Sequence, residues 1–198
     1  EWSTNEKAAL EVAAGASYSG ARTLVTMKQV GLNVASDPLM SLAYVGVEGG
    51  MVIVSADDPG PISSQTEQDT RHFAQFAHLP CFDPSSPEEA YAMTIAAFEL
   101  SEKYKTPVLL RPTTRVCHAC ASVEIETERT PKSPRGFIKD TQRFVIFPRS
   151  SYLNHIKIEQ RYKPLSDEFS ASTLNRAEYA GQIGIACGGI SYAYVKEA

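Results

Sequence analysis

Residues 3–33 read STNEKAALEVAAGASYSGARTLVTMKQVGLN, which is the most distinctive stretch of the chain. Its first half consists mainly of small residues at helical spacing, and this pattern predicts a helix that neighbouring backbone can approach closely. Glu6 opens the helix, near the positive end of its dipole. A short strand, Arg22–Thr26, and a glycine-bearing turn, Met27–Gly31, are expected to follow. At this level Glu6 fits two interpretations: a capping-type carboxylate on a tightly packed helix, or a carboxylate that serves a site.

The composition indicates one full domain and a piece of a second, with enough apolar residues for a sizeable core. The formal net charge is −4, and the basic residues are scattered. Both features argue against nucleic-acid binding, because phosphate contacts need a concentrated basic face. No apolar run approaches the roughly 20 residues that span a bilayer, and no signal segment opens the chain. The four cysteines predict reduced thiols and a cytoplasmic location.

Farther along, short apolar runs that predict buried strands alternate with helical patterns. The strands are expected at Met51–Val54, Pro80–Phe82 and Pro107–Arg111. The helices are expected from Gly31 to Leu42 with a break at Asp37–Pro38, through Phe73 and Phe76, and from a Ser86 cap to Tyr104. This alternation extends to about Arg115 and predicts an α/β fold, a parallel sheet flanked by helices.

Ligands of such sheets bind beyond the carboxyl ends of the strands. In this chain those ends are the Met27–Gly31 turn, the Ser55–Gln68 loop and the Pro112–His118 loop, so we expect one shared crevice. Three side chains of the second loop and its end have the polar character of substrate contacts: Gln65, Thr66 and Arg71. A solvated loop is the alternative.

The pattern changes after Cys120. Charges and prolines alternate with short β-like pieces such as Phe144–Phe147, which predicts an extended connector over residues 116–178, with a possible helix at Asp167–Tyr179. Residues 182–191 then read as a strand, a glycine turn and a helix start. We therefore expect a first domain at 1–115 that lacks its N-terminal part, since Glu1–Ser3 reads as the end of a strand, and the opening of a second α/β domain at 179–198.

Two short motifs are too weak to define a site by themselves. Gly188-Gly189 follows an expected strand, but neither GxGxxG nor GxxxxGK[ST] is present, so a tight turn fits better. Cys117 and Cys120 form a lone CxxC without the second pair that structural zinc normally needs, and a loop thiol pair is the simpler interpretation. The role of this pair stays open.

Three longer segments carry a resemblance to a known family. They are NEKAALEVAAGASYSGARTLVTMKQVGLNVASDPLM from Asn5, SADDPGPISSQTEQDTR from Ser55 and LRPTTRVCHA from Leu110. With them the chain closely resembles the α subunits of indolepyruvate:ferredoxin oxidoreductases, a branch of the thiamine-diphosphate-dependent 2-oxoacid:ferredoxin oxidoreductases. The resemblance implies a pyrimidine-binding domain at 1–115, and at 179–198 the start of a transketolase C-terminal-like domain.

The resemblance also implies roles for individual residues. Glu6 matches the glutamate that contacts N1′ of the cofactor's aminopyrimidine, where a shared proton favours the imino tautomer. Glu11 is a weaker rival on another face of the helix. The segment beside the aminopyrimidine matches Lys28, Gln29, Val30, Gly31 and Asn33. The family holds magnesium and diphosphate in a different subunit, so Asp57 and Asp58 are predicted to form a turn and no metal ligand is assigned.

The implied protein oxidises aryl pyruvates to acyl-CoA. Its partners would be a β subunit, ferredoxin, coenzyme A and the 2-oxoacid, in at least a heterodimer. Its iron–sulfur clusters would lie in a C-terminal region beyond this chain, consistent with the absence of four-cysteine cluster motifs here. A second hypothesis is a non-catalytic α/β domain that keeps the fold as an assembly or regulatory module.

Overall fold

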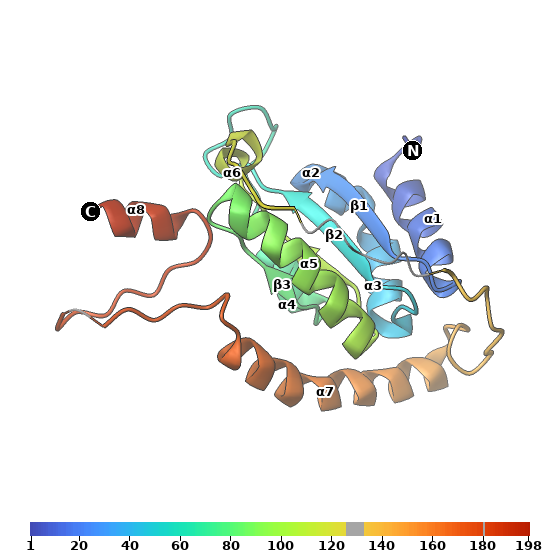
Figure 1. The fold of residues 1–198 in the computed structure, drawn as a ribbon. Helices are drawn as coiled ribbons and strands as arrows, with labels where there is room; N and C mark the ends of the chain where they lie inside the picture. The colour runs from blue at the N-terminus through green and yellow to red at the C-terminus, as the bar shows by residue number, and fades with distance from the viewer. Residues whose placement is uncertain (126–132, 180) are drawn as a thin grey trace.

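A four-stranded parallel sheet forms the centre of the molecule (Figure 1). The computed structural model describes residues 1–125, 133–179 and 181–198. The strands are β1 (Thr23–Lys28), β2 (Met51–Ala56), β3 (Cys81–Phe82) and β4 (Val108–Leu110), and their order in the sheet is β1-β2-β4-β3. All the pairings are parallel, with Val25 opposite Ile53 and Ile53 opposite Leu109. The predicted fold class, a parallel sheet flanked by helices, is confirmed.

Alternate residues of the central strand β2 face two separate hydrophobic clusters. Ile53 packs in the first cluster with residues of four helices: α1 (Glu6–Tyr18), α2 (Gln29–Val34), α3 (Ser36–Val45) and α4 (Arg71–Phe76). Val52 packs in the second cluster with α5 (Pro87–Tyr104) and the end of α7 (Pro148–Ala171). Because strand side chains alternate between faces, β2 is covered on both sides.

The capping signals explain why two helices begin where they do. Ser86 accepts a hydrogen bond from the Glu89 amide at 3.2 Å and Pro87 occupies the first turn, so α5 starts where the sequence predicts and ends at Tyr104. Asn5 is the N-cap of α1 and accepts a hydrogen bond from the Ala8 amide at 2.9 Å. Glu6 is therefore the first helical residue of α1.

Two predictions about the region after β1 were wrong in detail. β1 continues to Lys28 and α2 starts at Gln29, so the expected Met27–Gly31 turn is a direct strand-to-helix junction. The expected helix from Gly31 to Leu42 is two helices that meet at Ala35, not at Asp37–Pro38. The reason is that a proline in the first helical turn has no intrahelical N–H to lose, so Pro38 lies inside the start of α3.

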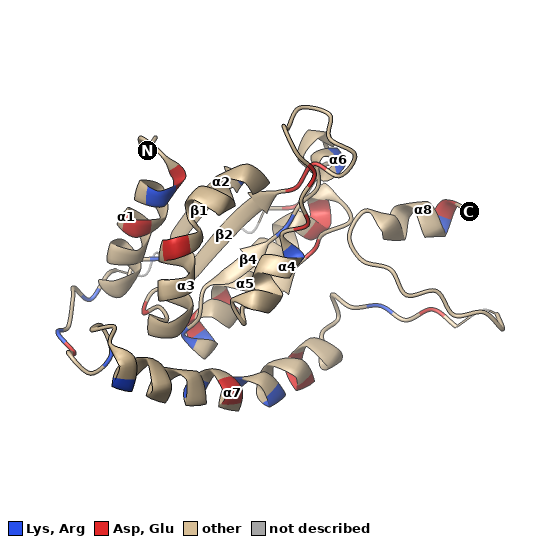
Figure 2. Cartoon of the chain, turned by 180° about the vertical axis from the view of Figure 1, so that it is seen from behind, with Lys and Arg blue, Asp and Glu red and all other residues tan. Residues whose placement is uncertain are grey.

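The predicted extended connector was also wrong in part. α7 is a 24-residue helix that runs along one side of the domain (Figure 1), and Phe144–Phe147 forms no strand. The expected helix Asp167–Tyr179 overlaps only the last turn of α7. α7 buries Ile158 and Leu165, while the charged residues are spread along the helix (Figure 2) and most of them are exposed. This amphipathic pattern was mistaken for a linker. Residues 126–132 of the predicted connector lie outside the described residues.

The C-terminal tail differs from its predicted strand–turn–helix unit. Within the described residues 182–191 no strand forms, and Ile183 and Ile185 are exposed because no neighbouring strand pairs with them. The helix start is correct, since α8 (Ser191–Glu197) follows directly. A further short helix, α6 (Thr114–His118), replaces most of the predicted Pro112–His118 loop. Residues Glu1–Ser3, expected to end a strand, have no regular structure. No described helix is long and apolar enough to cross a bilayer.

Candidate functional site

The carboxyl ends of β1, β2 and β4 lie at one edge of the sheet, where contacts join the segments that follow them, and the shared crevice expected there stays a prediction. Lys28 Nζ donates to the Ser63 carbonyl at 3.3 Å, which links the end of β1 to the loop after β2. The Thr114 amide donates to the Asp57 carbonyl at 2.9 Å, which links that loop to the segment after β4. These contacts follow from the parallel register, in which Asp57, directly after β2, still pairs with Thr113, three residues after the end of β4.

Glu6 lies directly against Gly31, so the structure brings two predicted site residues together. A Cβ atom on Gly31 would lie 2.7 Å from Glu6 Cγ and 2.9 Å from Glu6 Oε1, closer than real Cβ contacts come. The glutamate side chain therefore occupies the space that any other residue of α2 would fill. A larger residue here would have to displace the flexible Glu6 side chain, so the glycine matters through this close approach and not through its backbone angles.

The Glu6 carboxylate is partly buried and makes no hydrogen bond or ion pair with any described residue. Its neighbour Lys7 pairs instead with Asp37, with 3.0 Å between Nζ and Oδ2. Glu6 is also the first residue of α1, where the helix dipole favours a negative charge. Glu11, the rival carboxylate, is exposed. The geometry thus leaves Glu6 free to accept a hydrogen bond from a ligand.

Gln29 is fully buried behind this junction. Its Nε2 donates to the Thr66 carbonyl at 3.1 Å, while its Oε1 is buried and has no hydrogen-bond partner among the described residues. A buried acceptor without a donor is costly, so such an atom indicates a missing partner or a site that changes on binding. Of the other predicted residues of this segment, Val30 is partly buried, and Lys28 and Asn33 are exposed.

Asp58 organises the loop after β2 through backbone hydrogen bonds. Its Oδ2 accepts from the amides of Ile62, Ser63 and Ser64 at 2.9 to 3.0 Å. Its Oδ1 accepts from the Thr114 hydroxyl at 2.7 Å. The hydrogen bonds from Ser63 and Thr114 hold the pKa of Asp58 well below its usual range. Asp57 itself continues the sheet as a bridge to Thr113, the chain bends at Pro59–Gly60, and Asp58 fixes the shape of the loop that follows.

Asp57 forms a buried ion pair that sequence analysis did not find. Its side chain is fully buried, and its Oδ2 lies 2.6 Å from Arg111 Nε. Thr70 adds two hydrogen bonds to the same carboxylate, from its amide at 2.9 Å and from its hydroxyl at 2.8 Å. A possible signal was present in the sequence: a charged residue follows each of two apolar strands, at Asp57 and Arg111.

Asp83 and Arg71 extend this ion pair, because Asp83 contacts both arginines. Asp83 Oδ1 lies 3.3 Å from Arg111 Nη1, and Asp83 Oδ2 lies 3.3 Å from Arg71 Nη1. Arg71 also holds Asp69, with 2.6 Å between Arg71 Nη2 and Asp69 Oδ2, and this bond lowers the pKa of Asp69 to about 2. Burial raises the pKa of Asp83 in spite of its two arginine neighbours.

The three residues predicted to contact substrate are thus in different situations. Gln65 and Thr66 are exposed on the loop, and the Thr66 carbonyl is already used by Gln29. Arg71 is about half exposed, but its guanidinium is engaged by Asp69 and Asp83. Substrate contact by these residues stays a prediction, and Arg71 would need to share its carboxylate partners with a ligand.

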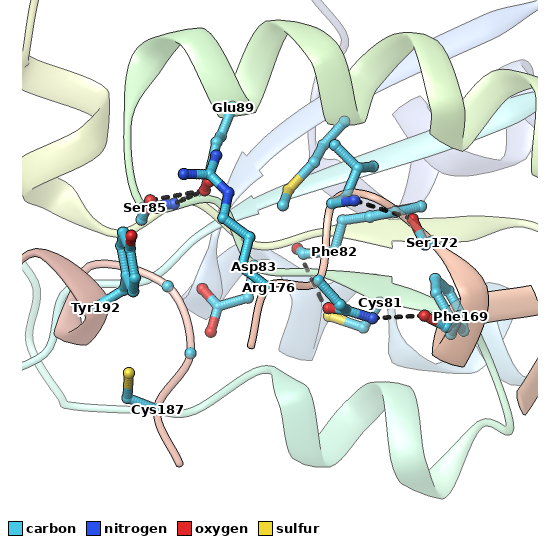
Figure 3. A pocket seen from close by; sticks show the side chains of 15 residues that line it. Cys81, Phe82, Asp83, Ser85, Glu89, Phe169, Ser172, Arg176, Cys187 and Tyr192 are labelled. Atoms are coloured by element: carbon cyan, nitrogen blue, oxygen red, sulfur yellow. Dashed lines mark hydrogen bonds and ion pairs between the residues drawn. The ribbon is translucent and has the colours of Figure 1, made fainter. Parts of the chain in front are cut away.

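A cavity of about 260 Å³ opens at the carboxyl end of β3, beside Asp83 (Figure 3). The C-terminal tail closes one side of it: Arg176 Nη2 donates to Glu89 Oε1 at 2.8 Å, and Gly189 lies against the Asp83 carboxylate. Gly189 has φ +56° and no space for a Cβ, so the Gly188-Gly189 pair serves as a tight turn over Asp83.

The Cys117–Cys120 pair lies at the end of α6, and both residues are exposed. Among the described residues no group of three or more His, Cys, Asp or Glu side chains is placed to hold a metal ion. The role of the pair stays open.

Comparison with known proteins gives a family and several relatives. The family model described as "Pyruvate flavodoxin/ferredoxin oxidoreductase, thiamine diP-bdg" matches residues 3–173. The chain is 48% identical over 205 residues to the indolepyruvate oxidoreductase subunit IorA of Thermococcus kodakarensis. It is 47% identical over 201 residues to the subunit of the same name from Methanothermobacter thermautotrophicus. Each match covers 100% of this chain and 32% of the relative, so the chain spans about a third of their length.

A solved structure shares the fold. It is a 2-oxoglutarate:ferredoxin oxidoreductase from Magnetococcus marinus with 2-oxoglutarate, coenzyme A and succinyl-CoA bound. The TM-score is 0.68 at 16% sequence identity, and the match covers 98% of this chain and 42% of that chain. At this identity the similarity concerns the fold alone.

Proposed function

The chain belongs to the pyruvate flavodoxin/ferredoxin oxidoreductase family, and from that premise we propose that it forms the aminopyrimidine side of a thiamine diphosphate site. The complete enzyme would oxidatively decarboxylate indolepyruvate and other aryl pyruvates to acyl-CoA. The observation that carries the proposal is the Glu6 carboxylate, which lies against Gly31 and has no partner among the described residues. The names of the relatives support the choice of substrate.

The residues present fit the aminopyrimidine half of this cofactor. A free carboxylate at a helix start can accept a hydrogen bond from a protonated ring nitrogen. Gly31 leaves the space in which the Glu6 side chain lies, so a bulkier residue in α2 would move the carboxylate away from this position. Gln29 offers a second, unused acceptor behind it.

Bound thiamine diphosphate supplies the carbanion chemistry that decarboxylates 2-oxoacids. The part of this chain is to hold a proton between Glu6 and N1′ of the aminopyrimidine, which favours the ring's imino tautomer. Lys28, Gln29, Val30, Gly31 and Asn33 would form the wall beside the ring. Gln65, Thr66 and Arg71 would contact the 2-oxoacid, with Arg71 as the residue that can pair with its carboxylate.

The remaining parts of the site would come from elsewhere. We assign magnesium and the diphosphate to a β subunit, as the family resemblance implies. Asp57 and Asp58 are not proposed as ligands, since they already accept hydrogen bonds from Arg111, Thr70, Thr114 and loop amides. Iron–sulfur clusters that pass electrons to ferredoxin would lie in another part of the parent chain. Coenzyme A would accept the acyl group at the joined site.

The test is steady-state kinetics of the complete α and β subunits with indolepyruvate, coenzyme A and an electron acceptor. Glu6→Gln keeps the size of the side chain and removes its charge. We expect kcat to fall by about 10²- to 10⁴-fold, the range for loss of an acid–base group.

Glu11→Gln on the exposed face of α1 is the matched control and should leave kcat unchanged. A Glu6→Gln enzyme with near-normal turnover would refute the catalytic role and favour the hypothesis of a non-catalytic module. Faster turnover of pyruvate or 2-oxoglutarate than of aryl pyruvates would refute the substrate assignment alone.

A further inference from the structure

Arg161 interrupts the apolar face that α7 turns toward the domain. Its neighbours on that face are Ile158, three residues before it, and Leu165, four residues after it, with exposed fractions of 2% and 8%. Residues at this spacing lie on one side of a helix. The position thus carries a guanidinium where the pattern calls for an apolar residue.

Arg161 makes no ion pair or hydrogen bond with any residue that the structure describes, and its Nη2 is buried without a partner. Burial lowers the pKa of this guanidinium. Two other cations on and beside α7 have ion-pair partners: Lys163 with Asp167 at 2.5 Å, and Lys103 with Glu168 at 2.7 Å. Arg161 as a whole is only partly buried, but a guanidinium nitrogen that is buried without an acceptor is unfavourable, so this end of the side chain is suited to receive an anion.

An apolar cavity of about 230 Å³ lies next to this guanidinium, between α4 and α7. Most of its wall is aliphatic or aromatic, and none of the lining residues is acidic: Ala74, Gln75, His78, Leu79, Pro80, Ile158, Arg161, Tyr162, Leu165, Ser166 and Phe169. A dry cavity of about 150 Å³ is enough to bind benzene. The space therefore suits one aromatic ring or a short branched alkyl group.

A second cavity, of about 500 Å³, borders Arg161 on another side, but its cations are largely neutralised. Arg143 and Lys105 share Glu48, and Lys103 pairs with Glu168. In the apolar cavity, by contrast, an anion would meet Arg161 without a competing carboxylate. The apolar cavity is therefore the better place for an anion.

We propose that the cavity between α4 and α7 binds a monocarboxylate with a small apolar body, an aryl or branched-alkyl acid whose carboxylate pairs with Arg161. Guanidinium and carboxylate form two parallel hydrogen bonds, and the apolar body covers the aliphatic wall. Leu79 and Pro80 of the lining precede β3, so this site lies at the amino end of that strand. It is separate from the Glu6 site, and the proposal does not rest on the proposed function.

The test is a ¹⁹F NMR titration of the full-length subunit in its native complex at pH 8. The probes are 4-fluorophenylacetate and its uncharged analogue 4-fluorophenylacetamide. We expect the acid to bind at least tenfold more tightly than the amide. Arg161→Met should abolish this difference, because it removes the charge and keeps the length of the side chain.

Lys163→Met is the matched control, since it removes a cation from the exposed side of α7 and should keep the preference for the acid. Gln75→Trp narrows the cavity from its exposed rim and should weaken binding of both probes without disturbing the core. Equal affinity for acid and amide in the native protein would overturn the proposal. An acid preference that survives Arg161→Met, or that Gln75→Trp leaves unchanged, would overturn it as well.

Discussion

Substitution of Asp57 by Asn tests whether the buried ion pair holds together the strand ends that carry the site. The change removes the carboxylate charge that lies 2.6 Å from Arg111 Nε. It also replaces one carboxylate oxygen by an amide nitrogen, which cannot accept the hydrogen bonds that Arg111 and Thr70 donate in the native protein. Removal of one partner of a buried pair costs about 3–5 kcal/mol. Arg111 keeps a 3.3 Å contact with Asp83, so we expect the lower end of this range, about 3 kcal/mol.

Hydrogen–deuterium exchange of the complete protein measures this loss locally. Opening of the sheet edge exposes the amides of Asp57, Leu109 and Arg111, which donate to Pro112, Pro80 and Phe82 carbonyls. A loss of about 3 kcal/mol corresponds to exchange faster by about 10²-fold. Asp37→Asn breaks the exposed Lys7–Asp37 pair and should produce no measurable change. Equal exchange in the two variants would refute the role of the buried pair.

Two further predictions concern the site residues. Gly31→Ala would place a Cβ 2.7 Å from Glu6 Cγ and displace the carboxylate, so we expect turnover to fall by about 10²-fold. Gly15 has open space around it, so Gly15→Ala should leave turnover unchanged. Equal turnover of these two alanine variants would contradict the contact. Bonding to Arg71 lowers the pKa of Asp69 from 3.8 to about 2, so its contribution to stability is complete above pH 4 and is lost as the pH falls toward 2. Urea unfolding at pH 5, 4 and 3, followed by far-ultraviolet circular dichroism, measures this effect. Between pH 5 and pH 3 the free energy of unfolding should fall less for Asp69→Asn than for the native protein. An equal fall in the two proteins would contradict this assignment.

Local signals in the sequence predicted most of the fold correctly. Ser86 and Pro87 begin α5 because a side-chain acceptor and a residue without an N–H suit a helix start, whatever the helix packs against. The continuous apolar run Met51–Val54 is β2, because only a strand covered on both faces needs apolar residues at every position.

Features that depend on partners distant in the sequence were not predicted. Asp57 and Arg111 are 54 positions apart, and neither residue type indicates by itself which loop it will meet. α7 was mistaken for a connector because it buries a narrow stripe, contains Pro164 and exposes many charges. The contact of Glu6 with Gly31 was not predicted either, since no spacing rule relates the start of α1 to α2, and the family resemblance implied only that each residue lies beside the cofactor.

The most direct test of the central claim is circular dichroism of the complete α and β subunits with thiamine diphosphate and magnesium. The imino tautomer of the bound cofactor gives its own dichroic band, which depends on the proton held at N1′ and not on turnover. We expect the band in the native complex and its loss in Glu6→Gln, with cofactor binding itself retained. A band that persists in Glu6→Gln would contradict the assignment of Glu6 and make Glu11 the next residue to change.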